Sequence, residues 1–174
     1  MKMQFTYNIF LIGFMGSGKS TVADYLCEKF DMDVVEMDQV IAERERMSIS
    51  DIFEKHGELY FRDLETKLLV ELQEKTNTVV SCGGGVAMRE CNVTEMKKNG
   101  KVVLLTAKPE TILERVENNH DRPLLENNKT VAYIAELMEK RREKYEAAAD
   151  MIIETGGKST QKICEEMIQR LGEQ

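Results

Sequence analysis

The stretch that decides the fold reads NIFLIGFMGSGKST and runs from Asn8 to Thr21. Its first five residues are mostly apolar, which is typical of a buried strand. The segment from Gly13 to Ser20 follows the pattern G-x-x-x-x-G-K-[ST], and a helix is expected from Lys19 onward. Glycines there let backbone N–H groups turn toward phosphate oxygens, and the start of the helix adds the positive end of its dipole. The stretch therefore predicts a phosphate-binding loop between a strand and a helix.

The motif also assigns roles to its own residues. Lys19 is expected to reach the β- and γ-phosphates as a catalytic residue, and Ser20 to place its hydroxyl on Mg²⁺. Gly16, Ser17 and Gly18 complete the expected cradle. The motif identifies the phosphoryl donor as a nucleoside triphosphate, but it does not identify the acceptor.

Short apolar runs alternate with longer amphipathic segments along the rest of the chain. Strands are predicted at 8–12, 34–37, 78–82, 101–106 and 151–154. Helices are predicted at 19–30, 38–46, 48–56, 58–75, 89–98, 109–117, 130–149 and 158–171, with a polar loop at 118–129. This alternation predicts an α/β fold of three layers, in which helices cover both faces of a parallel sheet. Ligands of such sheets bind beyond the carboxyl ends of the strands.

Length and composition narrow the class of protein. A chain of 174 residues fits a single domain, spanning 1–174. Its net charge of −7 and its lack of Trp argue against binding to nucleic acid or to an anionic membrane. Four cysteines without a C-x-x-C pair, with only two histidines, exclude a zinc site and favour reduced thiols in the cytoplasm. The apolar run at 9–15 is too short to span a bilayer.

Other P-loop classes fit less well than a small-molecule kinase. A GTPase would carry Asn-Lys-x-Asp, but this chain has Asn128-Lys129-Thr130-Val131. Nucleoside monophosphate kinases of the adenylate type usually place Gly after the loop Lys, where this chain has Ser20. Two carboxylates, Glu36 and Asp38, end the predicted second strand, where spacing by two puts them on one face.

The chain resembles the shikimate kinase family over roughly residues 8–170. The resemblance rests on residues 13–21, Glu36-Met37-Asp38, Phe61-Arg62-Asp63-Leu64-Glu65, Ser81-Cys82-Gly83-Gly84-Gly85, Arg122-Pro123-Leu124-Leu125, and Arg141 followed by Tyr145. It implies an adenylate-kinase-like P-loop fold with a central five-stranded parallel sheet, a substrate-binding region at about 38–75 and a mobile lid at about 115–129. It further implies transfer of the γ-phosphoryl group of ATP to the 3-hydroxyl of shikimate with Mg²⁺, in chorismate and aromatic amino acid biosynthesis, by a monomer.

The resemblance also implies the site residues. For shikimate these are Asp38, Arg62, Glu65, Gly83, Gly84, Gly85 and Arg141. Asp38 would hold the hydroxyls and accept the proton, Arg62 and Arg141 would bind the carboxylate, and Glu65 would orient Arg62. Further nucleotide-binding residues would be Thr21, Arg115, Arg122, Thr155, Lys158 and Ser159, with Arg122 also catalytic at the transferring phosphoryl group. Ser20 would bind the metal, with Glu36 and Ser81 acting through water.

Glu65 can be judged without the family. At about 100° per residue, Phe61, Leu64 and Leu68 share one helix face, and Glu65 falls within that face. A buried carboxylate needs a partner because a lone buried charge is costly. Arg62, three residues earlier, is within reach on the same helix.

Two positions depart from the family pattern, and two alternatives stay open. Glu36 stands where the family has Asp, which changes the reach of this acid toward a metal-bound water, and Cys82 stands where the family usually has Thr. Arg142 is expected to be an ordinary surface charge. A gluconate-type sugar-acid kinase would share the loop but not the Arg62 and Arg122 motifs. The second alternative, from another class of protein, is a regulator or partner-binding module that binds nucleotide without catalysing a reaction.

Overall fold

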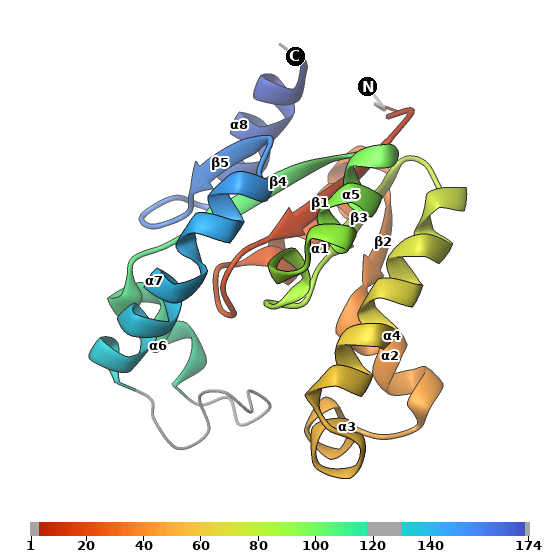
Figure 1. The fold of residues 1–174 in the computed structure, drawn as a ribbon. Helices are drawn as coiled ribbons and strands as arrows, with labels where there is room; N and C mark the ends of the chain where they lie inside the picture. The colour runs from red at the N-terminus through yellow and green to blue at the C-terminus, as the bar shows by residue number, and fades with distance from the viewer. Residues whose placement is uncertain (1–3, 118–129, 173–174) are drawn as a thin grey trace.

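The computed structural model describes residues 4–117 and 130–172, and its strands and helices alternate along the chain (Figure 1). The strands are β1 Asn8–Ile12, β2 Asp33–Glu36, β3 Thr78–Ser81, β4 Gly100–Thr106 and β5 Met151–Glu154. The helices are α1 Lys19–Phe30, α2 Met37–Glu45, α3 Ile49–His56, α4 Glu58–Glu71, α5 Glu90–Lys98, α6 Pro109–Val116, α7 Val131–Ala148 and α8 Thr160–Gly172. Two 3₁₀ turns, η1 Leu72–Glu74 and η2 Val86–Met88, complete the order.

The five strands form one parallel sheet in the order β2-β3-β1-β4-β5, as the sequence predicted. β1 lies at the centre, and the chain crosses to its other side between β3 and β4. The carboxyl ends of β1, β2 and β3 therefore open at the same edge of the sheet. At this edge a doubly wound sheet binds its ligands.

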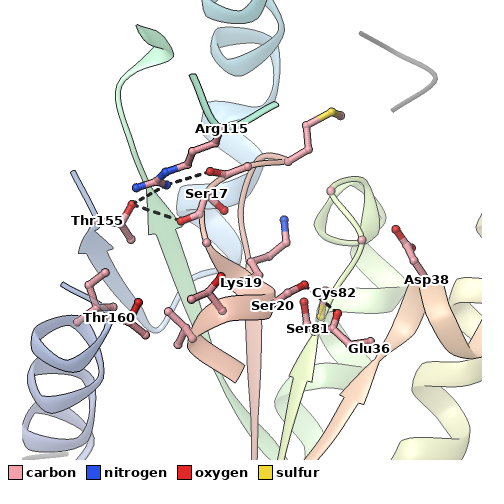
Figure 2. A pocket seen from close by; sticks show the side chains of 18 of the residues that line it. Ser17, Lys19, Ser20, Glu36, Asp38, Ser81, Cys82, Arg115, Thr155 and Thr160 are labelled. Atoms are coloured by element: carbon pink, nitrogen blue, oxygen red, sulfur yellow. Dashed lines mark hydrogen bonds between the residues drawn. The ribbon is translucent and has the colours of Figure 1, made fainter. Parts of the chain in front are cut away.

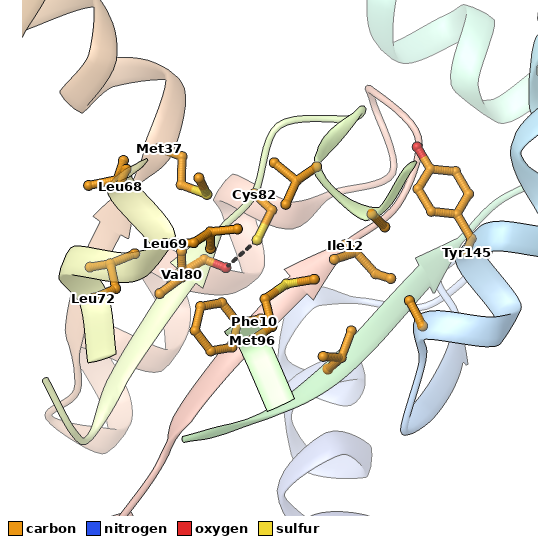
Figure 3. Close-up of a cluster of buried hydrophobic side chains, with 14 of the residues drawn as sticks. Phe10, Ile12, Met37, Leu68, Leu69, Leu72, Val80, Cys82, Met96 and Tyr145 are labelled. Atoms are coloured by element: carbon orange, nitrogen blue, oxygen red, sulfur yellow. Dashed lines mark hydrogen bonds between the residues drawn. The ribbon is translucent and has the colours of Figure 1, made fainter. Parts of the chain in front are cut away.

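Alternate residues of β1 enter two separate cores. Phe10 and Ile12 pack in a cluster with side chains of α2, α4, α5 and α7, part of which Figure 3 shows. Ile9 and Leu11 point to the opposite face and pack against α1 and α8. This period of two, with apolar residues on both faces, is the pattern of a parallel strand buried between helical layers. The predicted three-layer α/β class is confirmed.

One predicted boundary was wrong in a way that affects the site. The sequence placed Glu36 and Asp38 on one face of a strand, but β2 ends at Glu36 and α2 begins at Met37. Glu36 keeps extended dihedral angles and Met37 is fully buried as the first residue of the helix. Asp38 therefore belongs to the first turn of α2, where a carboxylate suits the helix dipole.

The predicted loop at 118–129, including Arg122 and most of the expected lid at 115–129, lies outside the described residues. Within the parts of the chain that are described, no helix is both long and apolar enough to cross a membrane. All four cysteines are free thiols, with Cys27 and Cys91 exposed and Cys82 and Cys164 buried.

Candidate active site

A pocket of about 420 Å³ lies beyond the carboxyl ends of the central strands (Figure 2). The phosphate loop and the start of α1 form its floor. Its lining residues are Met15, Gly16, Ser17, Gly18, Lys19, Ser20, Thr21, Val22, Glu36, Asp38, Ser81, Cys82, Gly83, Gly84, Arg115, Thr155, Lys158, Thr160 and Ile163. The pocket thus brings together the predicted phosphate, metal and acceptor residues from four strand ends.

The backbone of the loop adopts the geometry that its glycines allow. Gly18 precedes α1 with φ 104°, a left-handed conformation that favours glycine. Lys19 is the first residue of α1, and its Nζ donates to the carbonyls of Gly13, at 2.5 Å, and Phe14, at 3.2 Å. In Figure 2 the Lys19 side chain extends into the middle of the pocket. A cation thus lies beside the open N-terminus of a helix, an arrangement that attracts phosphate.

The predicted metal ligands meet beside this lysine. Ser20 Oγ donates to Glu36 Oε2 at 3.1 Å, and Ser81 lines the same side of the pocket. Burial raises the pKa of Glu36, and hydrogen bonds from Ser20 and Ser81 offset part of that rise. Two hydroxyls and one carboxylate are hard oxygen donors, which suit Mg²⁺ bound largely through water and phosphate. The described residues contain no cluster of three or more His, Cys, Asp or Glu side chains that could hold a metal.

The opposite wall joins α6 and the end of β5 to the phosphate loop. Arg115 Nη1 donates to the Gly16 carbonyl at 2.9 Å and lies 3.4 Å from Thr155 Oγ1. Thr155 is buried, with Oγ1 2.9 Å from the Thr106 carbonyl and 3.3 Å from that of Ser17. These contacts hold Arg115 and Thr155 against the loop, where the sequence expected the nucleotide.

The third part of this wall is the start of α8. Lys158 lines the pocket and pairs with Glu166 at 2.9 Å. Ser159 is not among the lining residues, and its Oγ accepts from the Lys162 amide at 3.1 Å, as a helix cap does. Sequence reasoning missed Thr160 and Ile163, which line the pocket from the first turn of α8. No motif marked them, and an apolar residue on an amphipathic helix indicates core rather than a ligand wall.

The acceptor end of the pocket is formed by Asp38, Gly83 and Gly84. A Cβ atom added at Gly83 would lie 2.6 Å from Glu65 Oε2 and 2.9 Å from Asp38 Oδ1. Two carboxylates from α2 and α4 therefore converge on this one glycine. Cys82 lies in the same wall, and burial strongly raises the pKa of its thiol, which keeps it neutral.

Arg62 and Glu65 pair behind the glycine loop rather than lining the pocket itself. Arg62 Nη1 donates to Glu65 Oε1 at 2.8 Å, and Glu65 is fully buried on the apolar face of α4, as its helical position predicted. Burial raises the pKa of Glu65 to about 7 although Arg62 lowers it. The guanidinium lies 5.4 Å from the centre of the Phe61 ring, and a side chain at Gly85 would collide with it.

A second arginine approaches the glycine loop from α7. Arg141 Nη1 donates to the Gly84 carbonyl at 3.1 Å, and its guanidinium carbon lies 5.7 Å from the centre of the Phe14 ring. The Tyr145 hydroxyl donates to the same carbonyl, a role that the sequence did not indicate. Arg142, in contrast, is an exposed residue paired with Glu139 and Glu146, as expected.

The comparisons with known proteins identify this combination. The shikimate kinase family model matches residues 15–172. A shikimate kinase of Persephonella marina is 45% identical over 164 residues, which cover 94% of this chain and 98% of that protein. A shikimate kinase of Dehalococcoides mccartyi is 41% identical and covers 92% of this chain and 90% of its own length. The chain belongs to the shikimate kinase family.

Solved shikimate kinases share the architecture. The enzyme of Acinetobacter baumannii, solved in complex with shikimate, has a TM-score of 0.90 and 32% identity, and the match covers 95% of this chain and 92% of that one. The enzyme of Aquifex aeolicus has a TM-score of 0.81 and 38% identity, with 95% and 96% coverage. As a shikimate kinase family member, the chain is an ATP-using kinase with a P-loop kinase fold.

The gluconate-type alternative finds support only in the fold. A gluconokinase of Sinorhizobium meliloti has a TM-score of 0.61 at 17% identity, and the match covers 98% of this chain and 94% of that one. At this identity the likeness extends to the arrangement of strands and helices alone, while the shikimate kinases are related in sequence as well.

Proposed function

We propose that this chain transfers the γ-phosphoryl group of ATP to the 3-hydroxyl of shikimate. The products are shikimate 3-phosphate and ADP, on the route to chorismate and the aromatic amino acids. The observation that carries the proposal is that one pocket has the phosphate loop at one end and Asp38, Gly83 and Gly84 at the other. Two arginines from different helices back onto that glycine loop, which suits a planar carboxylate.

At the nucleotide end, the loop amides and Lys19 bind the β- and γ-phosphates. Both present partners of Lys19 Nζ are carbonyl groups of the loop itself. When ATP binds, Lys19 exchanges these carbonyls for phosphate oxygens. Arg115, Thr155 and Lys158 form the wall for the base and ribose. Thr21 and Ser159 complete the nucleotide-binding set carried over from the family, although Ser159 lies outside the lining of the pocket. Arg122, outside the described residues, remains the proposed cation on the transferring group.

At the acceptor end, Arg62 and Arg141 bind the carboxylate of shikimate. Because Glu65 pairs with Arg62 at 2.8 Å, it fixes the direction in which the guanidinium points. Asp38 holds the reacting hydroxyl in line with the γ-phosphorus. As the new O–P bond forms and the bond to the ADP oxygen breaks, the hydroxyl proton passes to an Asp38 oxygen. Positioning dominates, because phosphoryl-transfer transition states are loose and need little help from a base.

Ser20 and, through water, Glu36 and Ser81 would hold a magnesium ion beside the phosphate loop. Such an ion supplies positive charge to the β- and γ-phosphate oxygens. The carboxylate of Glu36 is held toward Ser20 at 3.1 Å and stays beside the phosphate loop. Its extra methylene, relative to the family's Asp, is compatible with contact through a water molecule.

Measurement of ADP release tests this function. The purified chain is assayed with ATP and Mg²⁺ against shikimate, gluconate, quinate and nucleoside monophosphates. Release that depends on shikimate is the expected result. Release with gluconate but not shikimate would favour the sugar-acid kinase, and no release with any acceptor would favour a regulator. Lys19→Ala, which should fold but lose turnover, controls for contaminating kinases.

The proposal also covers the oligomeric state of the enzyme and its cellular compartment. The described pocket joins the phosphate loop and the acceptor end within one chain, and we propose that the enzyme acts as a monomer. Two exposed free thiols, Cys27 and Cys91, fit the reducing cytoplasm. Sedimentation at assay concentrations tests the monomer directly.

A further inference from the structure

A fully buried amide, Asn92 on α5, lies outside the active-site pocket. Its Nδ2 donates to the Val86 carbonyl at 2.9 Å, in the turn that follows the three glycines. Its Oδ1 lies 2.7 Å from Thr66 Oγ1, on the helix that carries Arg62 and Glu65. One side chain therefore bridges the glycine loop and α4.

The direction of each hydrogen bond follows from the partners. A carbonyl can only accept, so the amide nitrogen of Asn92 must face Val86 and its oxygen must face Thr66. The Thr66 hydroxyl lies 3.2 Å from the Arg62 carbonyl but 2.7 Å from Asn92 Oδ1, and we assign its one proton to the shorter bond. Arg89 Nη1, at 3.2 Å, donates to the same hydroxyl and also to Asp63 at 2.9 Å. Arg89, Thr66, Asn92 and Val86 form a continuous chain of donors and acceptors.

The bridge lies beside two tight contacts between the glycine loop and α4. Gly83 has no room for a Cβ atom because Glu65 Oε2 would be 2.6 Å away, and Gly85 has none because of the Arg62 guanidinium. A small change in the spacing between α4 and the glycine loop would therefore move Arg62 and Glu65 relative to the loop. Asn92 and Thr66 join these two segments next to Glu65.

We propose that Asn92, through Thr66, is a positioning residue that holds the glycine loop and α4 at the distance required for shikimate binding. The proposal rests on the proposed function, whose shikimate site it concerns. Neither residue lines the pocket, so each acts through Arg62, Glu65 and the loop backbone. The residues facing the bridge are Arg89, Asp63 and Cys91.

The chain offers a matched control on the same two elements. Gln73, in the η1 turn that continues α4, donates from Nε2 to the Glu95 carbonyl of α5 at 2.6 Å. This amide also bridges the α4 segment and α5, but at the end remote from the glycine loop. Loss of the Gln73 hydrogen bond should lower stability without moving Arg62 or Glu65.

The experiment compares Thr66→Val, Thr66→Ser and Gln73→Leu in the shikimate-dependent ADP assay. Thr66→Val keeps the shape but removes the hydroxyl, leaving buried Asn92 Oδ1 with only the weak thiol donor of Cys91 at 3.9 Å. We expect KM for shikimate to rise about tenfold, the range of one lost buried hydrogen bond. KM for ATP should change less than about twofold, and Thr66→Ser should restore the wild-type values. Gln73→Leu should lower the melting temperature but leave KM for shikimate unchanged.

Two outcomes would overturn the positioning role. One is an unchanged KM for shikimate in Thr66→Val, and the other is an equal rise in Gln73→Leu, which would mark a general loss of stability. Asn92→Asp provides an independent check, because it keeps the acceptor for Thr66 but loses the donor to Val86, and it too should raise KM for shikimate. A wild-type chain without shikimate-dependent release would instead refute the proposed function, so the two failures are distinguishable.

Discussion

Glu65 is a buried carboxylate held between an arginine and a second carboxylate. Arg62 pairs with one oxygen at 2.8 Å, while Asp38 lies across Gly83 from the other. Burial outweighs the attraction of Arg62, so the pKa of Glu65 rises to about 7. In the proposed function Glu65 orients Arg62 toward the carboxylate of shikimate, which would offset the cost of burying this carboxyl group.

The raised pKa predicts how stability depends on pH. Because the folded-state pKa of about 7 exceeds the ordinary value of 4.5, the folded protein holds this proton more tightly than the unfolded chain. The contribution of Glu65 to stability is complete below pH 4.5 and is lost as pH rises through about 7. The free energy of unfolding of Glu65→Gln, relative to wild type, should therefore increase over that interval. Urea unfolding of both proteins between pH 4.5 and 8 measures this, and a constant difference would contradict it.

Asp38 and Glu36 share the pocket but should respond differently to substitution. Asp38→Asn should lower kcat by a factor on the order of 10² or more, since a neutral amide cannot take the hydroxyl proton and is a weaker acceptor for positioning it. Glu36→Asp should be mild because a water molecule mediates its metal role, and Glu36→Ala should mainly raise the Mg²⁺ requirement. Steady-state kinetics with a Mg²⁺ titration separate the two. A nearly silent Asp38→Asn with a crippled Glu36→Asp would reverse the assignment.

At the scale of elements, β1, α1 and β5 begin and end where the sequence predicted them. Their ends carry clear signals, namely Gly13 after β1 and Gly18 before α1. The β2–α2 junction was wrong because spacing by two, from Glu36 to Asp38, fits both a strand and the entry to a helix. The η2 turn was missed because three glycines favour many backbone conformations. The glycine loop that leads into this turn is held by Arg141 and Tyr145 at the Gly84 carbonyl, and both residues are distant in sequence.

The two arginines proposed to bind the carboxylate of shikimate come from two helices, Arg62 from α4 and Arg141 from α7. Arg62→Ala on α4 should weaken shikimate binding by roughly 2–5 kcal/mol, because it removes one side of the carboxylate clamp and leaves Glu65 buried without its cation. Affinity for ATP should change little, since Arg62 lies behind the glycine loop at the acceptor end and not beside the phosphate loop. Titration calorimetry with each ligand measures both effects.

The control for this substitution is Arg44→Ala. Arg44 pairs with Glu71 of α4 at 2.7 Å, but this pair is exposed and remote from the loop. Exposed pairs contribute about 0–1 kcal/mol, so shikimate affinity should stay at the wild-type value. Equal losses in the two variants would mean that α4 had shifted as a whole.

At the scale of the molecule, a net charge of −7 opposes the binding of two anionic substrates. Positive charge is nevertheless concentrated at one edge of the sheet, where the fold brings together Lys19, Arg115, Arg62 and Arg141. Their convergence could be predicted from the family motifs. The hydrogen bonds that hold Arg141 to Gly84, or Arg115 to Gly16, could not, because they join residues about sixty or a hundred positions apart.

The same sheet should make the chain unfold as one unit. Because β1 supplies Phe10 and Ile12 to one core and Ile9 and Leu11 to the other, neither layer can separate without exposing the central strand. We therefore expect a single thermal transition, and both ADP and shikimate should raise its midpoint. Each ligand at 100 times its Kd should add about 2.7 kcal/mol.

Calorimetric scans with each ligand test this, and Arg62→Ala sharpens the test. In that variant the shift with shikimate should largely vanish while the shift with ADP persists, because the nucleotide end does not include Arg62. Two transitions, of which only one responds to shikimate, would mean that the proposed substrate-binding region at about 38–75 unfolds independently of the sheet. The buried contacts of Met37, Phe61 and Leu69 with the strand residues of the first core argue for the single transition.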